Sequence, residues 1–422
     1  MPTLPPAIRP AVRTRLATAF ALCAMQVAPA AHAQSASIAG IDFDVSLTLD
    51  GFLHKRSPRE PGEPAGFGHG HDGHDHAHHH GHSHALENGF NAGHSEIALR
   101  ARSDLLDGML MIGFDDEDLA VEEAYLVTRA LPTGLRLKAG KFLSDIGYMN
   151  SRHSHDWDFV ERPLVNQHLF GDHGLQETGV QLSVTPATRH YTHFGVELLQ
   201  GNGEGLNRFD AGRYGRTRSG PRVITAFAKF GPELGPQDAL QLGVSAGGAR
   251  QYARVDDHGD HRHSLDGDAW FVGVDAMYRH ESGQAYGVGN WRVGGEYYYT
   301  RREVDARAWS PAQGWRRSPG SYSESQDGFY LEAVYGIAPR WQVGARAEAL
   351  GLSNRVVAFH PTAAVSEDTS WRYALQATWR PRETVFLRGQ LTHEDFAGAD
   401  KRGWAFTLQL NALFGSHPAH RF

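Results

Sequence analysis

Cysteine is nearly absent from this chain of 422 residues, because Cys23 is the only one. It lies in an apolar stretch, 16–28, which follows three arginines and precedes Ala31-His32-Ala33. A positive segment, a short apolar core and a small-x-small cleavage site are typical of a secretory signal peptide. We therefore predict that residues 1–33 are a signal peptide and that residues 34–422 form the mature chain.

The predicted mature chain has no thiol, which excludes disulfides, cysteine nucleophiles and cysteine-based zinc sites. Lysine is also scarce, with five in the whole sequence. The formal net charge of −7 becomes about −10 without the arginines of the signal peptide, so no nucleic-acid partner is expected. There is no compact Gly-x-Ser-x-Gly motif, and we expect no enzyme activity.

Long apolar runs are missing too, since none reaches the roughly 18 residues of a spanning helix. Instead, apolar and polar residues alternate with period two from residue 38 onward, in segments of about ten residues with Trp or Tyr near their ends. In one of them, Trp404, Phe406 and Leu408 alternate with polar residues such as Thr407 and Gln409. We count about sixteen such segments, including those near 238–250, 268–280, 290–302 and 326–336.

Short turns and mostly long polar loops alternate between these segments. This pattern predicts an all-β protein, a transmembrane antiparallel up-and-down outer-membrane β-barrel of about 16 strands, with short periplasmic turns and long external loops. A soluble β-sandwich or propeller shows the same alternation. The aromatic strand ends, the signal peptide and the alternating loop lengths favour the barrel.

The acidic, aromatic strand Glu122–Val127 turns at Pro-Thr-Gly into Leu135–Phe142, which ends in Ala-Gly-Lys-Phe. This hairpin and the C-terminal Phe422 resemble Gram-negative outer-membrane porins, most of all the phosphate-selective-porin-like group. The resemblance implies a channel in the outer membrane that contacts lipid and lipopolysaccharide, is inserted by the barrel assembly machinery and forms a homotrimer. The lysine cluster of phosphate-selective members is not evident, so phosphate specificity is not inferred.

Histidine is the residue in excess. The predicted first external loop, 55–93, contains a run in which nine of sixteen residues are histidine. Neutral imidazole is the commonest ligand of zinc and other borderline divalent metals, so we predict weak, multiple metal sites in a hydrophilic loop. The alternative is a loop that only shields the barrel or changes charge with pH. The candidate ligands in this run are His69, His71, His74, His76, His78, His79, His80, His82 and His84.

Two more external loops carry histidines in metal-binding spacings. In the predicted loop 251–267 the candidates are His258, His261 and His263, with an ordinary solvated loop as the open alternative. In the predicted loop 143–174, His153 and His155 lie near Asp156 and Asp158 in sequence, and there a solvated loop is the preferred interpretation. This longer loop is also the best candidate to fold inward as a constriction.

The polar strand face would line the pore, where charged residues set ion preference. Hydration and mutual pairing in a water-filled lumen is the simpler explanation of these charges. Acidic residues including Glu296, Glu332, Glu348 and Glu394 partly balance the basic ones. The predicted basic pore-lining residues are Arg100, Arg102, Arg136, Lys138, Arg292, Arg346, Arg372 and Arg388.

Together these features predict a porin-like channel for passive uptake of a divalent metal, zinc foremost, with the histidine loop capturing ions outside. No cofactor is required, because zinc or another divalent transition metal would be the substrate. Two alternatives stay open. One is a general or anion-preferring porin with an incidental histidine loop, and the other is a surface protein that sequesters metal and uses the barrel as an anchor.

Overall fold

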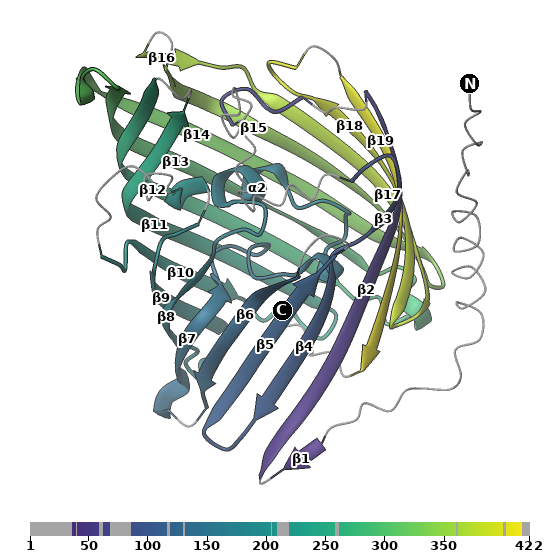
Figure 1. Ribbon diagram of the computed structural model, residues 1–422. Coiled ribbons are helices and arrows are strands. Elements are labelled where there is room, and N and C mark those ends of the chain that lie inside the picture. Colours follow the sequence, from purple (N-terminus) through teal and green to yellow (C-terminus); the bar gives the residue numbers. More distant parts are fainter. Residues whose placement is uncertain are drawn as a thin grey trace, which may run out of the picture.

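The computed structural model describes residues 36–38, 40–58, 62–67, 86–115, 119–129, 131–203, 205–208, 219–257, 261–359, 362–399 and 402–415. The predicted signal peptide and the histidine run 69–84 lie outside these residues. Sixteen long antiparallel strands form a closed barrel (Figure 1). They are β2 (Ile41–Ser57), β4 (Ser95–Arg102), β5 (Leu106–Phe114), β6 (Leu119–Thr128), β7 (Leu135–Leu143), β8 (Gln176–Val184), β9 (Tyr191–Leu199), β10 (Val223–Gly231), β11 (Asp238–Asp257), β12 (Arg262–His280), β13 (Trp291–Ser310), β14 (Gly314–Ala338), β15 (Trp341–Phe359), β17 (Ser370–Arg382), β18 (Val385–Asp395) and β19 (Gly403–Gly415).

The barrel closes between its last and first long strands. β19 pairs with β2 from Trp404 opposite Ser57 to Gly415 opposite Ser46. The short strands β1 (Ala36–Ile38), β3 (Gly89–Ala92) and β16 (Thr362–Ser366) add to the ends of the wall. The predicted fold class and strand number are confirmed, and closure pairs both edges of the sheet of sixteen long strands.

The period-two pattern places apolar side chains outside and polar side chains inside. On β2, Val45 is 51% exposed and Leu49 is 39% exposed, whereas their neighbours Asp44 and Thr48 are buried inside the barrel. An apolar exterior with a polar interior is the reverse of a soluble β-protein and is expected of a barrel that meets lipid. The described residues include no helix with the length and apolar character needed to cross a membrane.

Several strands extend further toward the long-loop end than the sequence pattern predicts. β11 continues to Asp257, β12 begins at Arg262, and β14 begins at Gly314. The prediction of a loop over 251–267 is therefore wrong for most of that segment, since the β11–β12 ladder runs up to the pair Asp257 and Arg262. The extended hairpins alternate in the opposite sense: on β13, Val304 and Ala306 are buried inside the barrel, whereas Glu303 and Arg307 are exposed. The prediction depended on apolar residues facing outward.

The loop between β7 and β8, residues 144–175, folds into the lumen, as predicted for the constriction (Figure 1). Its short helix α2 (Leu164–Phe170) contacts β13, β14 and β15. Phe170 lies edge-to-face against Phe271 and Tyr298, with ring centroids 5.1 Å and 4.9 Å away. The apolar core of the molecule therefore sits inside the barrel, between this inserted loop and the wall.

Polar side chains of the wall hold the backbone of the inserted loop. Glu348 Oε2 accepts a hydrogen bond from the N–H of Leu164 (2.6 Å), and Arg388 Nη2 donates to the carbonyl of Trp157 (2.7 Å). Glu296 accepts from the N–H groups of Tyr148 and Met149. These charge-assisted bonds satisfy backbone groups that a buried loop would otherwise leave unpaired. They fix the path of the loop across the lumen.

Candidate metal centre in the barrel lumen

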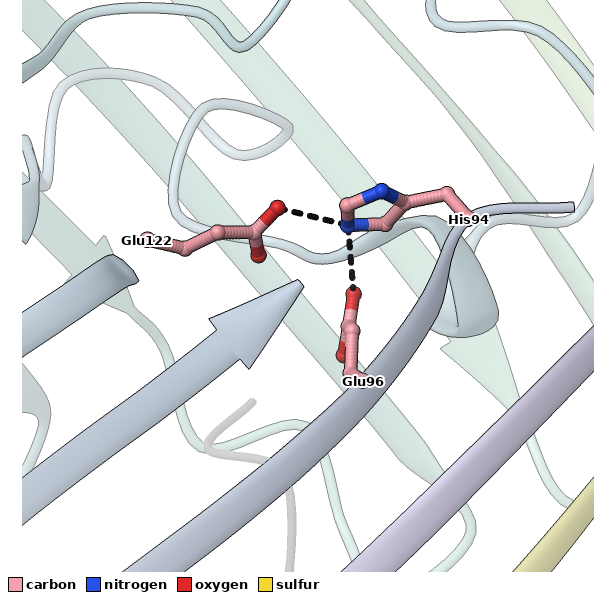
Figure 2. A group of neighbouring side chains, drawn as sticks. All are labelled: His94, Glu96 and Glu122. Atoms are coloured by element: carbon pink, nitrogen blue, oxygen red, sulfur yellow. Dashed lines mark ion pairs between the residues drawn. The ribbon is translucent and has the colours of Figure 1, made fainter. Parts of the chain in front are cut away.

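Three ligand-type side chains of the barrel wall meet on its inner surface. His94 directly precedes β4, Glu96 is the second residue of that strand, and Glu122 lies on β6. One ligand atom from each lies within 4.8 Å of the others, and both carboxylates are buried (Figure 2). His94 Nε2 is 2.5 Å from Glu122 Oε1 and 3.6 Å from Glu96 Oε1. We call these three residues the wall triad.

A bulge in β6 places Glu122 in this group. Met111 pairs with Glu123 and the next residue, Ile112, pairs with Val121, so Glu122 has no partner on β5. A β-bulge locally breaks the alternation of side chains and re-aims one of them. Glu122 and Glu123 are consequently both buried inside the barrel, although they are adjacent in sequence.

Glycine on β5 makes room for the contact between His94 and Glu122. A Cβ atom at Gly113 would lie 2.5 Å from Glu122 Oε1 and 2.5 Å from His94 Cε1. Such distances are too short for any side chain without displacing both ligands. The contact between His94 and Glu122 therefore requires glycine at position 113.

The inserted loop brings two more histidines to the same carboxylates. His153 Nδ1 is 3.6 Å from Glu96 Oε1 and 3.6 Å from Glu122 Oε2, and its Nε2 is 3.2 Å from Glu123 Oε2. His155 Nδ1 is 2.9 Å from Glu96 Oε2. The two imidazole rings stack with centroids 5.9 Å apart. The preferred interpretation of these histidines as part of a solvated loop is wrong, because the loop is packed inside the barrel.

Carboxylates control the charge of these imidazoles. Burial by itself lowers the pKa of His153, but Glu96 together with hydrogen bonds to Glu122 and Glu123 outweighs burial and raises that pKa well above its ordinary value. For His94 and His155, burial is again the largest single effect and lowers the pKa. The neighbouring carboxylates together have a larger effect, so the pKa values of both histidines are raised. Without a metal, protons on these histidines offset the charge of the carboxylates.

Raising the pH is expected to loosen the loop around His153 in metal-free protein. Folding raises the pKa of His153 above its ordinary value of about 6.5. The protonated ring therefore contributes its full stabilisation below about pH 6.5, and this stabilisation is lost as the pH rises through the pKa of the folded protein. Deprotonation then removes one of the positive charges that balance Glu96, Glu122 and Glu123 on the wall, beside Asp156 on the loop.

A spin label on Ser151→Cys would report this change, because the predicted mature chain has no other thiol. The mobility of the label should increase between pH 6 and a pH above the raised value, with chelator present. Constant mobility across that range would contradict the assignment of His153 as the charged contact.

The donor set suits a borderline divalent metal. Imidazole nitrogens combined with carboxylate oxygens are typical ligands of zinc, whereas calcium and magnesium prefer oxygen donors alone. In the described part of the chain, the wall triad is the one group of three His, Cys, Asp or Glu residues whose ligand atoms lie this close. The arrangement can hold an ion directly on the inner wall of the barrel.

The histidines that the sequence singled out elsewhere have other positions. The run His69–His84 and His258 lie outside the described residues. His261 is exposed just before β12, and His263 lies within β12 with its ring 5.7 Å from that of Phe359. The metal-binding predictions for these residues remain predictions.

The predicted basic pore-lining residues all lie on barrel strands, and several hold the inserted loop. Lys138 Nζ is 3.3 Å from Asp145 Oδ2, and Arg292 forms an ion pair with Asp158. Arg346 and Arg372 donate to Glu348, while Arg388 binds the loop carbonyl described above. Arg102 pairs with Asp44 near the turn end of the wall. Arg100 lies on β4 and Arg136 on β7.

Sequence reasoning missed His94, Glu96 and Glu122 as ligands, and Glu123 as their neighbour. His94 lies just beyond the predicted first loop and away from its histidine run, and the two strand carboxylates on β4 and β6 are ordinary lumen residues by pattern alone. One available signal was the pair Glu122-Glu123, since two adjacent charges in a strand of period two indicate a bulge.

Comparisons with known proteins agree with the fold. No family model matches the chain. An uncharacterized protein of Aquifex aeolicus is 30% identical over 349 residues, which cover 80% of this chain and 71% of the relative. Three solved structures have 11–12% identity and are covered over their full length: OmpT of Vibrio cholerae (TM-score 0.54, 90% of this chain), the anion-selective porin of Comamonas acidovorans (0.53, 89%) and the channel DcaP of Acinetobacter baumannii (0.53, 91%).

Proposed function

The chain belongs to one family with the uncharacterized Aquifex aeolicus protein and has the fold of outer-membrane porins, and from this premise we propose an outer-membrane channel that facilitates passive uptake of divalent transition-metal ions, zinc foremost. The phosphate-selective-porin-like group remains a prediction from the hairpin. The external histidine run would bind ions at the mouth of the barrel, and the wall triad with the loop histidines would bind them next inside the lumen.

One observation carries the metal preference. The wall triad and the loop histidines place imidazole nitrogens and buried carboxylates together inside the barrel, where a permeating ion would meet them. Conduction requires binding that is favourable enough for entry and weak enough for release. Because imidazole binds a metal only in its neutral form, protons compete with the ion, which suits transport better than permanent storage.

An anion-preferring porin is the second candidate, favoured by a different part of the lumen. At the turn end, a cavity of about 720 Å³ is lined by five arginines and two glutamates. A mouth with excess positive charge attracts small anions. The arginines are Arg279, Arg292, Arg340, Arg380 and Arg382.

Ion flux into liposomes distinguishes the two candidates. We expect barrels in liposomes loaded with a metal-sensitive dye to admit zinc faster than magnesium, since magnesium keeps its water and disfavours imidazole. Deleting residues 69–84 should slow zinc entry at low zinc concentration only, because capture matters least when ions are plentiful. Equal zinc and magnesium rates, with a reversal potential that favours chloride, would support the anion-preferring porin instead.

A further inference from the structure

We propose that His153 of the inserted loop is the fourth ligand of the metal held by the wall triad, so that a bound ion ties the constriction loop to the barrel wall. This inference rests on the proposed function, because it uses the same metal centre. It adds that the permeating ion changes the position and mobility of the loop that narrows its path.

The distances from His153 Nδ1 to two wall carboxylates are close to those between ligands of a tetrahedral site. Zinc bonds of about 2.0–2.1 Å at tetrahedral angles place ligand atoms about 3.3 Å apart. His153 Nδ1 lies 3.6 Å from an oxygen of Glu96 and 3.6 Å from an oxygen of Glu122, and His94 Nε2 is 3.6 Å from that same Glu96 oxygen. The four side chains do not yet surround one point, because His94 Nε2 contacts Glu122 Oε1 at 2.5 Å while His153 Nδ1 faces the other oxygen of Glu122. A bound ion would open the contact between His94 and Glu122 and draw His153 toward the wall triad.

His153 is also held in a suitable orientation. Its second nitrogen, Nε2, lies 3.2 Å from Glu123 Oε2, so the ring is directed by a carboxylate that is not itself a ligand. Metal-binding histidines commonly have such a partner on the other ring nitrogen, which fixes the tautomer and raises the basicity of the coordinating nitrogen. The bulge in β6 supplies both carboxylates, one for the ion and one for the ring.

The segment around His153 can respond to the ion while the rest of the loop stays fixed. Before it, the N–H of Met149 is bound by Glu296, and after it, the carbonyl of Trp157 is bound by Arg388. Between these two anchors, His153 and His155 contact the carboxylates of β4 and β6. Replacing the proton of His153 by a metal would convert a charge contact into a directional bond and would immobilise this short segment.

A spin label at Ser151→Cys provides the test, combined with a calorimetric zinc titration of the same full-length barrel. We expect saturating zinc to reduce label mobility in the otherwise unchanged protein. In His153→Ala, the wall triad should still bind zinc, with affinity lower by about 10–100-fold, but saturation should leave the label mobile. His190→Ala, in the turn between β8 and β9, serves as the matched control and should behave like the parent.

If His153→Ala does not fold, His153→Gln retains hydrogen-bonding capacity without an imidazole and answers the same question. Zinc binding without any change in label mobility, or an equal change in the His153 variant, would overturn the inference and leave the proposed function standing. Absence of zinc binding to the parent barrel would overturn both. Reduced mobility in the parent and the control, lost in the His153 variant, would support the inference.

Discussion

Glu96→Gln is expected to lower the zinc affinity of the barrel by about 100-fold or more, equivalent to about 2.7 kcal/mol of binding free energy. The Glu96 carboxylate is 2% exposed, and its two oxygens face imidazole nitrogens of His94, His153 and His155 at 3.6, 3.6 and 2.9 Å. Glutamine preserves the shape but removes the negative charge and is a poor ligand for zinc. This one substitution therefore affects the contacts of all three histidines.

The measurement is a zinc titration of the refolded barrel in detergent, repeated as zinc uptake into liposomes. Glu233→Gln is the matched control, because Glu233 is 63% exposed at a turn and lies outside the metal centre. The control should bind zinc like the parent. An affinity of Glu96→Gln within about threefold of the parent would exclude the wall triad as the binding site, since the loss of a charged ligand costs far more.

Glu348→Gln is expected to cost about 3–5 kcal/mol of unfolding free energy. The Glu348 side chain is fully buried between two guanidinium groups, with Arg346 Nε 2.9 Å and Arg372 Nε 2.8 Å from Oε1. It also accepts the N–H of Leu164 at the start of α2. Removing its charge leaves two buried cations without their shared partner and weakens the attachment of the inserted loop.

Urea unfolding of the refolded barrel would measure this loss, and single-channel recording would show its effect on the pore. A loosened loop should produce larger and noisier current. The exposed pair Arg301 and Glu303 provides the control, because Glu303→Gln removes a similar contact at the surface and should cost less than about 1 kcal/mol. Equal costs for the two substitutions would contradict the role of Glu348 as the buried anchor.

Most strands of the barrel wall could be predicted from the sequence, because the orientation of their side chains depends on neighbouring residues in the same strand. The alternation within a single strand identifies its two faces. On β2, for example, the exposed Val45 lies on the outer face and the buried Asp44 on the lumen face. The inward fold of the loop 144–175 was also predictable from its length and its aromatic residues. The strand ends near Asp257 and Gly314 were not, because the extended hairpins bury apolar residues such as Val304 and Ala306 inside the barrel and so reverse the apolar-outside pattern.

The metal centre illustrates the limit of the sequence. The sequence by itself determined the barrel, its lipid-facing exterior and an excess of histidine, since these follow from periodicity and composition. Only the tertiary structure decided that His94, Glu96, Glu122 and His153 meet, because they come from the start of β4, a bulge in β6 and a loop folded into the lumen. Segments separated along the chain become neighbours through barrel closure and loop insertion, which depend on every strand at once.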